Sequence, residues 1–61
     1  MKTTYSVWEP VTPETSYDAI TTSREGITYE MVYWFYSAAA ALKSVSKKGF
    51  VREDWDGYYS L

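Results

Sequence analysis

The fold of this chain depends on residues 28–49, which read TYEMVYWFYSAAAALKSVSKKG. The pattern predicts one long α-helix over residues 28–48, because Thr28 is a good N-cap and Gly49 is typical just past a helix C-terminus. A helix of about 20 residues would be about 30 Å long, the full width of so small a domain. Its core stripe, about 120° wide, would consist of Met31, Trp34, Phe35, Ala38, Ala41, Leu42 and Val45.

The opposite side of the expected helix is also apolar. It carries Tyr29, Tyr33, Tyr36 and Ala40, and the line continues through Lys43 and Lys47. Tyrosine combines a large apolar ring with a hydrogen-bonding hydroxyl and is enriched at interface hot spots. We therefore expect a protein interface here, either of a homodimer or with a different protein, with the lysines at its rim. The alternative is that the tyrosine rings lie flat on the helix and are partly solvated.

Two strands are expected before the helix. Residues 2–9 alternate as a strand does, and residues 15–22 form a weaker candidate. Pro10 and Pro13 bracket the connection between them, and neither can donate to a strand ladder. These segments therefore predict an N-terminal β-hairpin.

An extended segment is expected after the helix. It begins at residues 50–52, and Asp56-Gly57 predicts a two-residue hairpin turn. The expected fold is α+β: the N-terminal β-hairpin and this short C-terminal segment pack on one long helix, about residues 28–48. The whole chain, residues 1–61, would form a single small domain.

The composition limits how such a domain can be stabilised. A chain of 61 residues has little core, and without Cys or His it can form neither a disulfide nor a zinc site. Aromatic packing or oligomerisation must take their place, and aromatic residues make up 20% of the chain. The net charge of −2 is too small to indicate a nucleic-acid mimic.

The sequence also bears on location. Its N-terminus leads into no apolar segment of the secretory type. The longest uncharged stretch of the expected helix, residues 31–42, is shorter than the about 20 residues that a membrane span needs. The lack of Cys fits a reducing compartment. We expect a soluble, cytoplasmic protein with no membrane partner.

Most residue types that carry catalysis are missing. The chain has no His, Cys, Asn or Gln, which removes the usual general base, the thiolate nucleophile and the side-chain amide oxyanion donor. Glu53, Asp54 and Asp56 crowd the final turn, but Arg52 stands where an EF-hand loop needs its first calcium ligand. We expect no enzyme activity, no cofactor, no metal and no small-molecule substrate.

The last third of the chain suggests an alternative. Its pattern of glycine and apolar residues consists of Leu42, Val45, Gly49, Phe50, Val51, Gly57, Tyr58 and Leu61. This pattern resembles the end of a winged-helix domain, in which a recognition helix runs into a Gly-aromatic-Val strand and a short wing. The resemblance covers residues 42–61 and implies nucleic-acid binding through Lys43, Lys47, Lys48 and Arg52. Upstream it fails, because residues 1–22 are expected to form strands where the family has helices.

The function we expect is that of a non-enzymatic small regulator, which binds a protein partner or a second copy of itself. A phage- or prophage-type inhibitor of a host protein is one example that fits the small size, the missing catalytic groups and the aromatic surface. The residues expected to make the contact are Tyr29, Tyr33, Tyr36 and Ala40, with Lys43 and Lys47 beside them.

Overall fold

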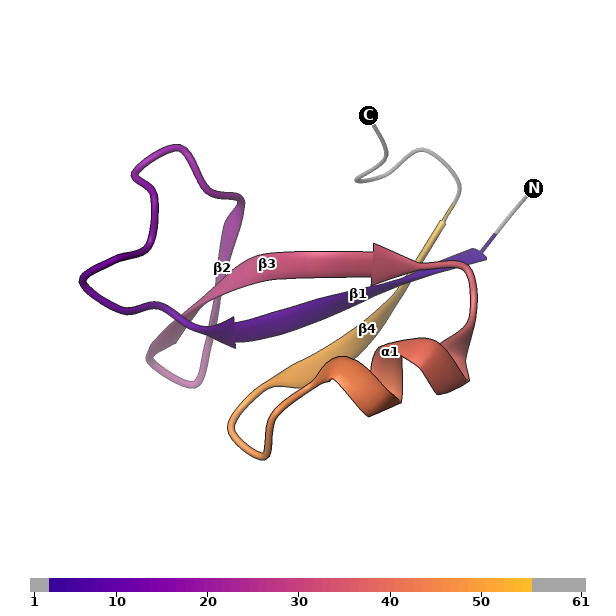
Figure 1. Ribbon diagram of the computed structural model, residues 1–61. Helices are drawn as coiled ribbons and strands as arrows, with labels where there is room; N and C mark the ends of the chain where they lie inside the picture. Colours follow the sequence, from indigo (N-terminus) through magenta and orange to yellow (C-terminus); the bar gives the residue numbers. More distant parts are fainter. Residues whose placement is uncertain (1–2, 56–61) are drawn as a thin grey trace.

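The computed structural model describes residues 3–55. For Trp55 it describes only the backbone. Its elements are β1 (Thr3–Pro10), β2 (Thr21–Arg24), β3 (Ile27–Phe35), α1 (Ala38–Ser44) and β4 (Phe50–Trp55). All neighbouring strands are antiparallel, in the order β2-β3-β1-β4, so β2 and β4 are the edge strands (Figure 1). The described chain is therefore mostly β, with a short helix on one side of a four-stranded sheet.

The long helix predicted over residues 28–48 is wrong. Residues 27–35 form strand β3, and helix α1 covers only residues 38–44. The composition changes at Ser37, since the Tyr, Val, Trp and Phe residues before it favour a strand and the alanines after it favour a helix. Ser37 is the N-cap of α1, and its side chain accepts a hydrogen bond from the Ala40 N–H at 3.3 Å. The domain is therefore not built on one long helix.

The expected N-terminal hairpin is also wrong, although residues 3–10 do form a strand. β1 lies inside the sheet and pairs with β3 and β4, not with residues 15–22. Residues 11–20 connect β1 to β2 without strand structure, and β2 pairs with β3. The β2–β3 hairpin closes through Glu25 and Gly26, whose φ angles of 53° and 82° suit a two-residue type I′ turn.

The chain enters β4 through a close approach to β1. β4 begins at Phe50, directly after Gly49, where the sequence indicated an extended segment. A Cβ at Gly49 would lie 2.2 Å from the main-chain oxygen of Trp8, so only glycine fits at this distance. The turn predicted at Asp56-Gly57 lies outside the described residues.

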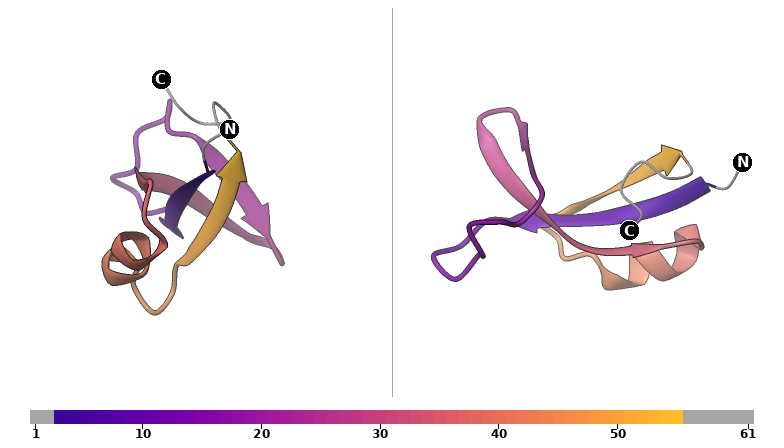
Figure 2. Two further views of the ribbon diagram at one scale, coloured as in Figure 1. Left: turned by 90° about the vertical axis from the view of Figure 1, so that its right-hand side faces the viewer. Right: turned by 90° about the horizontal axis from the view of Figure 1, so that it is seen from above.

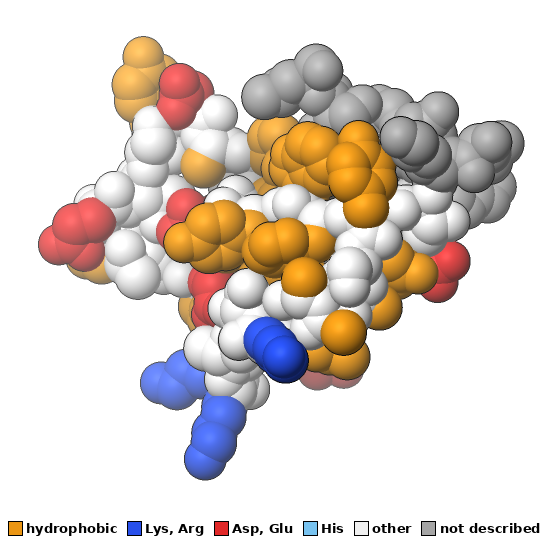
Figure 3. Space-filling model, turned by 45° about the vertical axis from the view of Figure 1, so that its right-hand side comes forward, with side chains coloured by type: hydrophobic (Ala, Val, Ile, Leu, Met, Phe, Trp, Pro, Cys, Tyr) orange, Lys and Arg blue, Asp and Glu red, His pale blue; other side chains and the backbone are white. Residues whose placement is uncertain are grey.

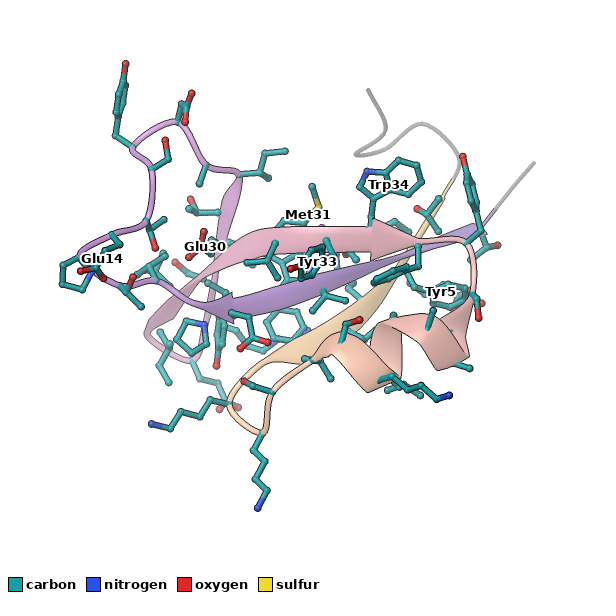
Figure 4. All side chains as sticks on the ribbon, in the orientation of Figure 1. Tyr5, Glu14, Glu30, Met31, Tyr33 and Trp34 are labelled. Atoms are coloured by element: carbon teal, nitrogen blue, oxygen red, sulfur yellow. The ribbon has the colours of Figure 1, made fainter. Side chains whose placement is uncertain are left out.

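A β-bulge decides which face of the sheet each side chain of β3 occupies. Trp8 of β1 pairs with Met31, but the preceding residue of β1 pairs with Tyr33, which makes Val32 an extra residue. Alternation therefore restarts on the other face after the bulge. Figure 4 shows the result, with Met31 and Trp34 on one side of β3 and Tyr33 on the side of α1.

One face of the sheet packs against α1. The helix contacts β1 and β3, and Ala41 in α1 and Val7 in β1 are completely buried. Alanine lets the helix backbone approach the sheet closely, and burial of these apolar side chains stabilises the contact. Because α1 is a helix of only 7 residues, it leaves part of this face uncovered.

The other face is concave, because the sheet curls strongly (Figure 2). The Arg24 guanidinium carbon on β2 lies 3.6 Å from the ring centroid of Phe50 on β4, although β2 and β4 are the two edge strands. The Tyr29 ring meets Phe50 edge-on at 4.8 Å, and Trp8 stacks on Phe50 at 6.0 Å. Such aromatic pairs are worth about 0.5–1.5 kcal/mol each beyond their burial. Phe50 is therefore the centre of the concave core.

Candidate protein-binding surface

The structure places the three tyrosines of the predicted interface in different surroundings. Tyr29 is 9% exposed and belongs to the concave core, whereas Tyr33 and Tyr36 are 58% and 57% exposed. A helix would have aligned all three, but strand alternation and the bulge separate them. Tyr29 therefore cannot contact a partner together with Tyr33.

The other residues of the predicted interface lie on and after α1. Ala40 is half-buried in the helix, Lys43 is exposed in its last turn, and Lys47 is exposed in the connection to β4. The sequence had placed Leu42 in the core stripe, yet it is 64% exposed, because the short helix packs through Ala41.

We name residues 32–36 the β3 end; they are the last four residues of β3 and the residue that follows it. All of them except Val32 are aromatic. The exposed Tyr33 ring lies 6.1 Å from the ring of Phe35, and the exposed Tyr36 ring meets Trp34 edge-on at 5.2 Å. Phe35 and Trp34 are half-buried. Each exposed tyrosine therefore contacts a ring that is partly buried in the sheet, and such a contact restricts the motion of the tyrosine side chain.

β2 stops before it reaches the β3 end. It pairs with residues 27–30, and the Met31 N–H donates to the Ile20 carbonyl at 2.9 Å. Past Met31, β1 is the one strand that pairs with β3 within residues 3–55. Figure 3 brings this side of the molecule forward and shows hydrophobic side chains gathered on it. Among the described residues no strand pairs with this edge of β3 past Met31, and an apolar strand edge of this kind is a template for pairing with another chain.

A network of polar side chains lies on the concave face. Trp8 Nε1 donates to Ser6 Oγ at 2.7 Å, and Ser6 Oγ donates to Asp54 Oδ2 at 2.6 Å. Arg52 Nε donates to the other carboxylate oxygen, Oδ1, at 2.9 Å. Ser6 and Asp54 are almost completely buried. The Asp54 carboxylate is thus occupied by two donors and closed to a substrate, and the network stabilises the fold.

The four basic residues of the predicted nucleic-acid site do not act as a group. Arg52 is paired with Asp54, and its guanidinium carbon lies 4.7 Å from the centroid of the Trp8 ring. Lys43, Lys47 and Lys48 are exposed near the end of α1. Arg52 is therefore committed to the concave core and is a poor phosphate ligand.

The winged-helix resemblance is only partly matched by the described residues. A strand does begin at Phe50, but α1 ends at Ser44 instead of continuing toward Gly49 as a recognition helix would. The helix is preceded by strands β1, β2 and β3. The wing tip and the second wing strand, residues 56–61, lie outside the described residues.

The described residues contain no cluster of metal ligands. Within residues 3–55, no group of three or more acidic side chains lies close enough to hold a metal ion. Glu53 and Asp54 are neighbours in β4 and point to opposite faces, while Asp56 lies beyond the described residues.

No helix in the described part of the chain is both long and apolar enough to cross a membrane. Comparison with protein-family models, curated proteins and solved structures gives no match.

One exposed aromatic residue was not singled out from the sequence. Tyr17 is fully exposed on the connection between β1 and β2, residues 11–20. The strand predicted over residues 15–22 contains Tyr17 and is wrong there, because Pro, Ser, Thr and Asp are frequent around it and favour loops. That composition was the signal that could have placed Tyr17 on the surface.

Proposed function

We propose that this chain is a small non-enzymatic binding domain that contacts a protein partner through the β3 end. The observation that supports the proposal is the pair Tyr33 and Tyr36, two exposed tyrosines that contact half-buried rings at a strand edge that β2 does not reach. Tyrosines in this setting dominate the binding energy of many interfaces. The partner is either a second copy of the chain or a different protein, such as the host target of a phage-type inhibitor.

The residues available favour binding over catalysis. The chain has no His or Cys, and the buried carboxylate of Asp54 is already occupied by Ser6 and Arg52. The exposed β3 end consists of apolar and aromatic residues, which supply contact area instead of proton transfer. A cytoplasmic location is part of the proposal and is supported by the lack of Cys.

The proposal is tested first by self-association. Sedimentation equilibrium of the wild-type chain at micromolar concentration should show a dimer if the partner is a second copy. Tyr33→Glu should return the protein to a monomer that is still folded by circular dichroism, because Tyr33 lies on the surface.

If the wild type is a monomer, the immobilised chain is used to capture proteins from a lysate. A true partner is retained by the wild type and by Ile27→Ala but lost from Tyr33→Ala and Tyr36→Ala, since Ile27 is a comparably exposed apolar residue (49%) at the other end of β3. A chain that neither dimerises nor retains any protein in a manner that depends on Tyr33 contradicts the proposal.

Nucleic-acid binding is the weaker candidate. With Arg52 paired to Asp54, Lys43, Lys47 and Lys48 are left to meet phosphates. Three contacts predict that log affinity falls with log salt at a slope of about −2.7. Binding with that slope, and its loss in Lys47→Glu, would favour this candidate over the β3 end.

A further inference from the structure

Two segments of the chain each carry charges of one sign. The charged residues of the segment 3–23 are all acidic, namely Glu9, Glu14 and Asp18, and those of the segment 31–51 are all basic, namely Lys43, Lys47 and Lys48. The structure places Glu14 and Asp18 on the exposed loop 11–20 and the lysines at and after the end of α1, whereas Glu9 lies beside the connection that carries Lys47. Figure 3 shows red side chains at the left of the molecule and blue ones at its lower end.

The loop 11–20 is held in a defined shape, and we name it the acidic loop. Val11 N–H donates to the Thr28 carbonyl at 3.1 Å, which fixes the start of the loop to β3. Thr15 Oγ1 donates to Glu30 Oε2 at 2.6 Å, which fixes its middle. The fully exposed Tyr17 follows shortly after. An exposed ring on an ordered loop is suited to contact a partner without a large loss of conformational entropy.

The three lysines and the exposed Leu42 all lie on α1 or on the connection that follows it, and we name Leu42, Lys43, Lys47 and Lys48 the basic end. Glu9 fixes the connection that carries Lys47, because its Oε2 accepts a hydrogen bond from the Ser46 N–H at 2.8 Å. Within residues 3–55, none of these lysines forms an ion pair. The same holds for Glu14 and Asp18 of the acidic loop. Both groups of charges are therefore available to an external partner.

We propose that the acidic loop of one copy of this chain docks on the basic end of a second copy. Tyr17 would pack against Leu42 and the aliphatic stem of Lys43, while Glu14 and Asp18 face the ammonium groups. The two surfaces differ, so the contact is head-to-tail and produces a series of copies unless the rotation closes it. This contact uses neither Tyr33 nor Tyr36 and is independent of the function proposed for the β3 end.

Sedimentation equilibrium over a wide concentration range tests the contact at two salt concentrations. At 0.01 M salt the Debye length is about 30 Å and at 1 M about 3 Å, so surface attraction acts only at low salt. The weight-average mass of the wild type should rise with protein concentration at low salt and stay at the monomer value at high salt. Tyr17→Ala should weaken the association about fivefold or more.

A charge swap makes the test specific to these two surfaces. Glu14→Lys with Asp18→Lys should abolish the association, and so should Lys43→Glu with Lys47→Glu in a separate protein. An equimolar mixture of the two proteins should associate again, because the reversed loop of one meets the reversed end of the other. Glu25→Lys with Glu53→Lys changes the net charge as much as the loop reversal does, and should leave the concentration dependence in place.

Three results would overturn the head-to-tail contact. The first is a wild type that stays monomeric at low salt and millimolar concentration. The second is a mixture of the two reversed proteins that does not associate although the wild type does. The third is an association that survives both reversals but is lost in Tyr33→Glu, which would assign it to the β3 end. Thermal melts of every variant establish that each is folded.

Discussion

The two faces of the sheet are closed by different means. On the concave face, side chains from all four strands contact one another, and the buried polar atoms of Ser6 and Asp54 are paired. On the other face, a helix of 7 residues buries Val7 but leaves Tyr33 exposed. We therefore assign stability to the concave face, and we propose that the β3 end serves binding. Replacing a residue of the concave face should therefore lower the free energy of unfolding more than replacing a residue of the same type on the other face.

The largest expected effect is the difference in the free energy of unfolding between substitutions of Tyr29 and Tyr33, two tyrosines of strand β3. Tyr29→Ala removes a buried ring that contacts Phe50 and should lower the free energy of unfolding by about 3–4 kcal/mol. Tyr33→Ala removes an exposed ring and should change it by about 0.5 kcal/mol or less. Urea denaturation followed by tryptophan fluorescence measures both. Equal losses in the two variants would remove the distinction between the faces.

The next effect concerns the ion pair of the concave face. Asp54→Ala leaves the Arg52 guanidinium without its carboxylate and should cost about 2–3 kcal/mol, near the lower end for a buried pair because Arg52 is 27% exposed. Glu53→Ala, at the neighbouring exposed position, is the matched control and should be nearly neutral. If Glu53→Ala cost as much as Asp54→Ala, the network would have no special role.

A smaller effect is expected at Gly49, where the connection from α1 reaches β1. Gly49→Ala places a Cβ against the Trp8 main-chain oxygen and should cost about 2 kcal/mol through backbone displacement. Gly26→Ala meets open space and is penalised only by its φ of 82°, by about 1 kcal/mol. Thermal denaturation should rank Gly49→Ala below Gly26→Ala, and the reverse order would contradict the close approach.

The smallest effect concerns the helix that only partly covers its face. Ser37→Ala removes the N-cap of α1 and should cost about 1 kcal/mol. Ser44→Ala is its control in the same helix, because Ser44 Oγ donates back to the Ala40 carbonyl and contributes little to helix stability. Circular dichroism melts compare them, and a loss in Ser44→Ala as large as that in Ser37→Ala would count against the N-cap.

The helix prediction failed over residues 28–35, which form most of strand β3, for a physical reason. Tyr29, Tyr33 and Tyr36 recur at helical spacing, yet Tyr, Val, Trp and Phe are also the residues that strands favour. Periodicity cannot distinguish the two when nearly every position is apolar. The bulge at Val32 adds to the difficulty, because it switches faces within the strand and removes the alternation that would have revealed it.

The candidate surface was predictable only in part. The sequence singled out Tyr33 and Tyr36, which are exposed, but also Tyr29, which is buried. Exposure depends on which strand lies alongside, and β2 covers residues 27–30 while leaving the β3 end open. Nothing local to Tyr29 or Tyr33 indicates where a neighbouring strand will stop.

The sequence by itself determined which chemistry is available, because a chain without His or Cys cannot acquire them on folding. It also determined local preferences, such as the extended character of residues 3–9 and of the segment that begins at Phe50. The tertiary structure alone decided that residues 27–35 are a strand and that the sheet curls around Phe50. A strand is stabilised by partners that are distant in the chain, as Ser6 with Asp54 and Arg24 with Phe50 show, and no local window of sequence contains both members of such a pair.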